Sequence, residues 1–260
     1  MLPRTPFGIK ALDEMMDGGA VRGSATVVEG APGTGKTTLG MQFIVNGIEQ
    51  HQEPGLILTF EEFPSQYYHD ALKFGWDLKK YEEQGMLRVV FTEPASAIRG
   101  LADLGGGIEN IIDEMGIKRC LVDSLTHFEY TVDDADTLRT AEFEFISALK
   151  REGVTSLLLR ENGNLLGDTR SLSQAPFIAD NYILLRYVEI DSAISKALLV
   201  LKMRGSRHEK SIRQFVITNR GIELMDKFQG QRGVMSGSPV KTNAQIFVEA
   251  FSGSARRKRG

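Results

Sequence analysis

The sequence predicts an α/β fold: a mostly parallel central sheet flanked by helices, extended toward the C-terminal end by antiparallel hairpins. Two observations lead to it. Through residue 160, short β-rich runs alternate with helical patterns, which is typical of a parallel sheet covered by helices. Beyond that point three β patterns follow closely, without a linker before them. The 260-residue length allows one or two domains, and we expect one, over residues 1–240, followed by a partly flexible tail at 241–260.

The first part of the chain predicts five strands, at 25–29, 56–60, 87–91, 119–123 and 154–159. Helices are expected between them, at 36–50, 64–74, 77–81, 108–115 and 133–151. In the first helix Leu39, Phe43 and Ile44 recur at helical spacing. Pro64 suits the first turn of the second helix, and Asp77 can cap the third.

After residue 160 the alternation of β-rich runs and helical patterns stops. A polar loop at 162–175 precedes β patterns at 181–190, 194–204 and 212–218, which we interpret as antiparallel hairpins. A short helical pattern at 244–251 carries an apolar stripe, which favours docking on the protein's own body over binding a partner helix.

Composition narrows the function classes. The formal charge of −3 becomes −7 without the four cations at 256–259, so the body of the protein is acidic. Nucleic-acid-binding proteins usually carry a basic excess, so nucleic acid is a disfavoured partner. A single cysteine, Cys120, excludes an intrachain disulfide and indicates a reducing compartment. With no secretory h-region and no apolar run near ~18 residues, we expect a cytoplasmic protein without a membrane span.

A phosphate-binding motif follows the first predicted strand. The segment at 30–37 fits G-x-x-x-x-G-K-[ST], between a β-rich run and a helical pattern. Glycines let backbone N–H groups turn toward phosphates at a helix N-terminus, while the lysine reaches the β- and γ-phosphates and the hydroxyl reaches Mg²⁺. The motif therefore predicts binding of a nucleoside triphosphate; a plain glycine-rich turn is the weaker reading. The candidate residues are Gly30, Gly33, Thr34, Gly35, Lys36, Thr37 and Thr38.

Acidic residues end two further predicted strands. Asp123, followed by Ser124, ends an apolar strand, where a carboxylate would face the loop and help Thr37 to hold Mg²⁺. A capping or loop aspartate is the alternative. Glu61 and Glu62 follow another strand, and adjacent carboxylates point in different directions, so one can activate water. Taken alone, such a pair is more often a solvated loop.

A cationic segment lies at 202–210. Lys202 and Arg204 alternate onto one face of a predicted strand and could stabilise charge on a transferring phosphoryl group. From the residues alone, a charged strand face is the favoured interpretation.

Together these motifs resemble the ring-forming RecA-superfamily P-loop ATPases of the KaiC type. The resemblance covers about residues 5–240. Its motifs here are GIKALD at 8–13, the loop at 30–37, TFEEFP at 59–64, DSLT at 123–126 and KMRGSRH at 202–208. KaiC carries two such domains in tandem, so this chain looks like a single-domain relative.

The resemblance implies a homohexamer with ATP held between subunits. Glu61 would be the base that activates water and Glu62 its partner, while Asp123 would lie near the magnesium. Lys202 and Arg204 would reach the γ-phosphate of the adjacent subunit, with His208 and Lys210 near its base. Hydrolysis would then require assembly.

One departure from the family pattern concerns phosphorylation. An adjacent Ser-Thr pair in the C-terminal half of KaiC accepts phosphate from ATP. The corresponding positions here are Pro176 and Phe177, which have no hydroxyl. We therefore expect ATP hydrolysis without autophosphorylation there, and no protein kinase activity.

The leading hypothesis is a ring ATPase whose hydrolysis switches its binding of a protein partner, which the sequence does not identify. A RecA or RadA-type DNA-dependent ATPase shares the same core but needs basic or aromatic loops around the ring's hole. The candidate segment at 162–174 contains one cation, Arg170. A non-catalytic, nucleotide-gated scaffold is the third reading.

Overall fold

The computed structural model describes residues 2–102, 106–132, 134–162, 178–190, 192–228, 231–232 and 240–241. Several predictions fall outside these ranges: the helix at 244–251, the basic positions 256–259, and Pro176 and Phe177.

A nine-stranded sheet, in the order β11-β10-β9-β8-β3-β7-β6-β4-β5, organises the described residues. Six strands, from β8 through β5, run parallel, whereas β9, β10 and β11 continue antiparallel. The strand bounds are β3 (Ala25–Gly30), β4 (Gly55–Thr59), β5 (Leu87–Phe91), β6 (Arg119–Asp123), β7 (Thr155–Glu161), β8 (Asn181–Ile190), β9 (Ala193–Met203), β10 (Arg213–Thr218) and β11 (Gly221–Lys227). Two small antiparallel pairs join β1 (Arg4–Thr5) to β2 (Ala20–Val21) and β12 (Gln231–Arg232) to β13 (Val240–Lys241).

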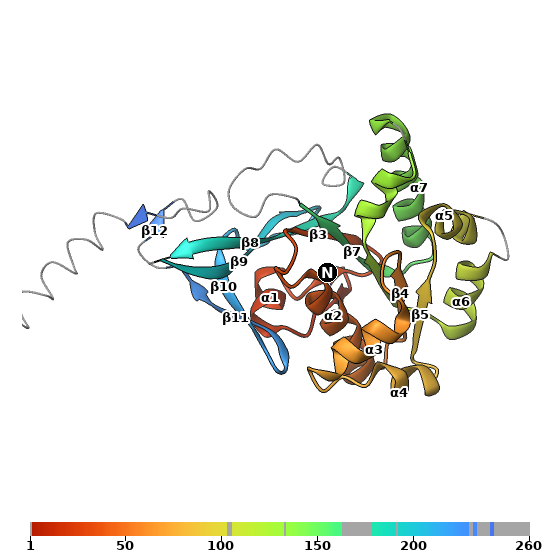
Figure 1. Ribbon diagram of the computed structural model, residues 1–260, viewed down its shortest axis with the longest axis horizontal. Helices are drawn as coiled ribbons and strands as arrows, with labels where there is room; N and C mark the ends of the chain where they lie inside the picture. Colours follow the sequence, from red (N-terminus) through yellow and green to blue (C-terminus); the bar gives the residue numbers. More distant parts are fainter. Residues whose placement is uncertain are drawn as a thin grey trace, which may run out of the picture.

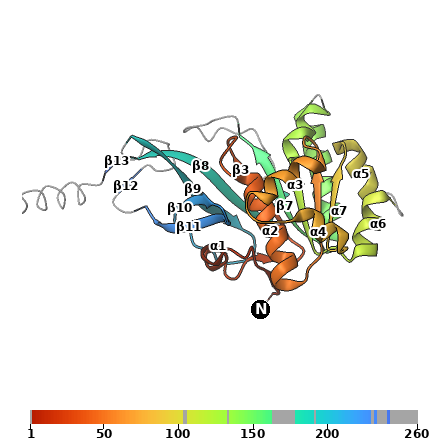
Figure 2. The same cartoon turned by 60° about the horizontal axis from the view of Figure 1, so that its bottom comes forward.

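Helices cover both faces of the parallel part of the sheet, and β8 to β11 extend away from helices α5 to α7 (Figures 1 and 2). Successive strand residues point to opposite faces: Ile57 enters an apolar cluster with α1 to α4, and Leu58 one with α5 to α7. The helices are α1 (Lys10–Met15), α2 (Lys36–His51), α3 (Pro64–Leu72), α4 (Leu78–Glu83), α5 (Pro94–Ala102), α6 (Gly107–Met115), the 3₁₀ helix η1 (Leu125–Tyr130) and α7 (Ala135–Arg151).

The predicted fold class is confirmed, with corrections in detail. The β8 strand pairs in parallel with β3, so the antiparallel extension begins only at β9. The β7 strand continues through Glu161, two residues beyond the predicted end. Helix α7 begins after Asp134, whose side chain caps it. Helices α1 and η1, with six residues each, are too short to show a clear helical period and were not predicted. Helix α5 and strand β11 were also not predicted from the sequence.

Candidate functional site

The phosphate-binding loop connects the buried strand β3 to the long helix α2. Gly33 and Gly35 have φ angles of 75° and 109°, which side-chain-bearing residues rarely adopt. The Thr34 hydroxyl donates to the Ala31 carbonyl at 2.8 Å and closes the turn from inside. Lys36 then begins α2, so the loop opens a helix as anion binding requires.

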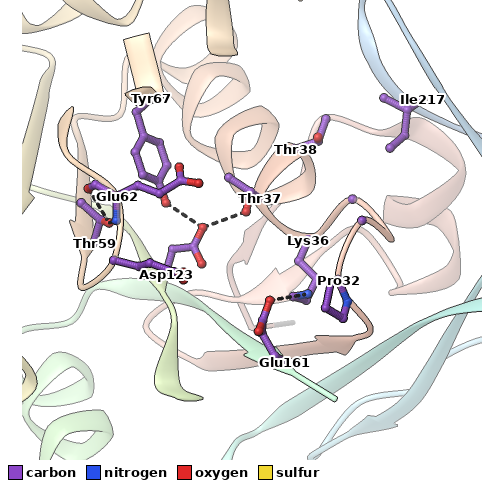
Figure 3. Close-up of a pocket in the computed structure, with 13 residues that line it drawn as sticks. Pro32, Lys36, Thr37, Thr38, Thr59, Glu62, Tyr67, Asp123, Glu161 and Ile217 are labelled. Atoms are coloured by element: carbon purple, nitrogen blue, oxygen red, sulfur yellow. Dashed lines mark hydrogen bonds and ion pairs between the residues drawn. The ribbon is translucent and has the colours of Figure 1, made fainter. Parts of the chain in front are cut away.

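A cleft of about 360 Å³ opens at this loop. Side chains from the loop, from β4, from α3 and from the ends of β6 and β7 surround it (Figure 3). Its lining residues are Pro32, Gly33, Gly35, Lys36, Thr37, Thr38, Thr59, Glu61, Glu62, Tyr67, Asp123, Glu161 and Ile217. Most of the predicted loop residues and all three predicted carboxylates therefore face one cleft, whereas Gly30, Thr34 and Ser124 are buried and do not line it.

The Asp123 carboxylate is the least exposed acidic group of the cleft. Its Oδ2 accepts hydrogen bonds from the Thr37 hydroxyl at 2.8 Å and from the Tyr67 hydroxyl at 2.6 Å (Figure 3). Burial raises the pKa of Asp123, and these two hydrogen bonds and the charge of Lys36 act in the opposite direction. Burial, followed by the nearby Asp123 charge, raises the pKa of Tyr67 well above its ordinary value. Tyr67 is thus a neutral donor to Asp123 at physiological pH.

The Lys36 ammonium group lies beneath the cleft. Its Nζ donates to the Ala31 carbonyl at 3.1 Å and lies 3.5 Å from a carboxylate oxygen of Glu161 (Figure 3). Burial lowers the pKa of Lys36, while the charges of Glu161 and Asp123 partly oppose that effect. The site thus holds a cation where a triphosphate bound to the loop would place its charge.

The two adjacent glutamates have different surroundings. Thr59 fixes their loop: its hydroxyl donates to the Glu62 carbonyl at 2.9 Å and accepts from the Glu62 N–H at 3.1 Å. Burial raises the pKa of Glu62, as do the neighbouring carboxylates Asp123, Asp70 and Glu61. The side chain of Glu61 is 70% exposed, and an oxygen of it lies 3.7 Å from Nε2 of His127.

The predicted cations lie at the opposite end of the sheet from the loop. Lys202 pairs with Tyr182 at the start of β8, and its Nζ donates to the Ala179 carbonyl at 2.7 Å. Arg204 falls in the turn after β9, which corrects the expectation that both residues share a strand, and its Nη1 lies 3.9 Å from an Asp180 oxygen. His208 and Lys210 follow in the same loop. The structure therefore brings none of these four predicted residues to the cleft of their own chain.

Sequence reasoning missed several residues that line the cleft. Glu161 ends an apolar strand beside β3, which is the same signal that points to Asp123, but the sequence pattern predicts that this strand ends two residues earlier. Tyr67 lies one turn into α3, and Ile217 lies near the end of β10. Their sequence contexts carry no motif, so the fold alone reveals them.

The Thr37 hydroxyl and the Asp123 carboxylate fit a Mg²⁺ site. Both are hard oxygen ligands, both line the cleft, and they lie within hydrogen-bond distance of each other. Magnesium is usually bound by one or two protein oxygens together with phosphates and water. A nucleotide in the loop would supply the remaining ligands.

Comparison with known proteins extends over most of the chain. A family model for the KaiC ATPase matches residues 5–229. The circadian clock oscillator protein KaiC of Thermostichus vulcanus is 35% identical over 247 residues, covering 95% of this chain and 47% of that protein. KaiC of Synechococcus elongatus is 33% identical over 258 residues, covering 99% of this chain and 48% of that protein. The chain therefore spans about half the length of the curated relatives it matches.

None of the helices within the described ranges combines the length and apolar character needed to cross a membrane. The family match includes the loop, the glutamate pair, the acidic end of β6 and the cationic segment after β9. The resemblance inferred from the motifs is confirmed: the chain belongs to the KaiC family of ATPases.

Proposed function

We propose that this protein binds ATP with Mg²⁺ in the cleft at the phosphate-binding loop and hydrolyses it to ADP and phosphate. One observation carries the proposal most strongly. Lys36 and Thr37 face the same cleft as Asp123, which is distant from them in the sequence, and Glu61 and Glu62 also lie in its wall. That arrangement supplies a phosphate receptor, oxygen ligands for a metal and a base in one place.

Each residue has a distinct task in the proposed reaction. Lys36 and the loop N–H groups hold the β- and γ-phosphates, and bound Mg²⁺ would neutralise part of their charge. Glu61 accepts a proton from water as the water oxygen attacks the γ-phosphorus. The bond to the bridging oxygen breaks, and that oxygen leaves as part of ADP. Because the Glu61 carboxylate is largely exposed, water reaches it readily.

A homohexameric ring completes the proposed site. Lys202 and Arg204 lie at the other end of the sheet from the loop, so they serve phosphate only if a neighbouring subunit presents them. In a head-to-tail ring each interface joins one subunit's loop to the next subunit's cations. His208 and Lys210 would then approach the nucleotide base.

The proposed biological role is a nucleotide-driven regulatory switch that binds a protein partner in one state of the ring. Pro176 and Phe177 replace the hydroxyl-bearing pair that KaiC phosphorylates, so protein kinase activity forms no part of the proposal. The acidic body disfavours DNA as the partner.

Glu61→Gln tests the hydrolytic function. The amide keeps the size of the side chain but cannot accept the proton of water, so phosphate release is expected to fall at least about 100-fold. Binding of ATP, measured by calorimetry, should be retained because Lys36 and the loop are unchanged. Glu114→Gln on the exposed side of α6 is the matched control. Equal phosphate release by wild type and Glu61→Gln would refute the catalytic assignment and favour a nucleotide-gated scaffold.

A further inference from the structure

The imidazole of His127 lies behind Glu61, outside the cleft. His127 belongs to η1, which follows the acidic end of β6. Its Nε2 lies 3.7 Å from Oε2 of Glu61, and its Nδ1 lies 3.4 Å from Oγ of Ser124. Both ring nitrogens therefore face a polar side chain, and one of these belongs to the proposed base.

The imidazole is more enclosed than the glutamate side chain. Phe60 and Tyr130 pack against the imidazole, with ring centroids 6.4 Å and 5.8 Å away. The His127 side chain is 21% exposed and that of Glu61 is 70% exposed. An exposed glutamate loses rotamer entropy when it is held in one orientation, so a partner that holds it there must offset that loss.

The two contacts are consistent with one neutral tautomer. A neutral imidazole has one donor and one acceptor nitrogen. If the Ser124 hydroxyl donates to Nδ1, the proton of the ring is on Nε2 and points to the carboxylate. Ser124 directly follows Asp123, so the same strand end supplies the proposed metal ligand and the group that sets this tautomer.

We propose that His127 is a positioning residue for hydrolysis: its Nε2–H holds the Glu61 carboxylate at the cleft, and Ser124 fixes the ring. This inference rests on the proposed function, because Glu61 must be the base.

Other charged groups on the surrounding elements have partners of their own. Arg160 of β7 is bonded to Glu129 of η1 and Glu142 of α7, and Glu161 faces Lys36. Tyr130 contacts the imidazole through its ring. Among the charged groups of the described residues, the carboxylate of Glu61 is the one that lies within ion-pair distance of the imidazole.

The test compares two substitutions. His127→Phe keeps an aromatic ring between Phe60 and Tyr130 but removes both nitrogens. His127→Gln keeps an N–H donor. His51→Gln, at the exposed end of α2, is the matched control. Each variant is assayed for kcat and KM for ATP at neutral pH, and its thermal unfolding is measured alongside.

We expect His127→Phe to lower kcat roughly 10- to 100-fold with little change in KM, because the base is misplaced while the nucleotide site is intact. His127→Gln should restore much of kcat, because its amide keeps a donor for the Glu61 carboxylate. Wild-type kcat in both variants would overturn the inference, as would a change in KM alone. If Glu61→Gln keeps full turnover, the proposed function itself fails; if Glu61→Gln is inactive but His127→Phe is normal, only the role of His127 is refuted.

Discussion

The ammonium group of Lys36 is a buried cation, and burial opposes its charge. Its pKa is lowered by desolvation, and Glu161 at 3.5 Å supplies the nearest compensating charge. A bound triphosphate brings more negative charge than one carboxylate. Phosphate binding therefore stabilises a cation that the protein alone holds at a cost.

Lys36→Met tests this role of the lysine. Loss of a charged hydrogen bond to phosphate, worth about 1.5–3 kcal/mol, should weaken ATP binding roughly 10- to 150-fold. Lys79→Met, at an exposed position of α4, is the control and should bind ATP normally. Calorimetric titration with ATP and Mg²⁺ measures both. Unchanged affinity in Lys36→Met would show that the nucleotide binds elsewhere.

Among individual residues, the sequence predicts those that belong to motifs. It misses those whose role comes from contacts with residues distant in the chain. Thr37 and Asp123 could be named because a loop pattern and a strand end identify each separately. Tyr67 and His127 could not, because their importance arises from contacts with Asp123 and Glu61 across different elements. No local pattern encodes such a contact.

Between elements, a buried ion network links β7 to the helices on one face of the sheet. Arg160 Nη1 lies 2.6 Å from Glu142 of α7, and its Nη2 is bonded to Glu129 of η1. The Arg160 and Glu142 side chains are 4% and 1% exposed. The network holds the β7 end, with Glu161, beside the helix that carries His127.

Arg160→Leu should destabilise the protein by roughly 3–5 kcal/mol, because it leaves the Glu142 carboxylate buried without its partner. The double variant Arg160→Leu/Glu142→Leu should recover much of that loss. Urea unfolding at neutral pH measures the free energy of unfolding for both. Equal stability of the single variant and wild type would mean that the pair contributes nothing to the fold.

A second link ties the cationic loop after β9 to the β10–β11 hairpin. Glu209 in this loop pairs with Lys227 of β11 at 2.6 Å and with Arg213 of β10 at 3.0 Å. Hydrogen bonds from Lys227, Ser211 and Arg213 lower the pKa of Glu209 from 4.5 to about 2. The loop that carries His208 and Lys210 is thereby fixed to the hairpin.

The lowered pKa gives a pH dependence with a defined sign. Between its folded value near 2 and its ordinary value of 4.5, Glu209 is protonated in the unfolded chain but charged in the native protein. Its contribution is therefore fully present above about pH 4.5 and is lost as the pH falls toward 2. In Glu209→Gln the free energy of unfolding should depend less steeply on pH in this window. Identical slopes in urea titrations of variant and wild type would contradict the assignment.

For the whole molecule, the strand order separates the cleft from the predicted cations of the same chain. The loop, the glutamate pair, Asp123 and Glu161 lie at the carboxyl ends of the parallel strands β3, β4, β6 and β7. Lys202, near the end of β9, and Arg204, in the turn after it, lie at the opposite end of the sheet, beside the start of β8. Sequence periodicity predicts the strands but not this order, because the pairing of β8 with β3 joins segments that are distant in the chain.

Mixing two inactive variants tests the central claim, a hydrolytic site shared between subunits, most directly. Glu61→Gln lacks the base but keeps the cations, whereas Arg204→Ala keeps the base but lacks a cation. In randomly mixed rings, about a quarter of the interfaces would join an intact Glu61 of one subunit to an intact Arg204 of its neighbour. We predict that each variant alone releases little phosphate and that the 1:1 mixture recovers about a quarter of wild-type turnover. A mixture as inactive as its components, or full activity of Arg204→Ala alone, would contradict a shared site.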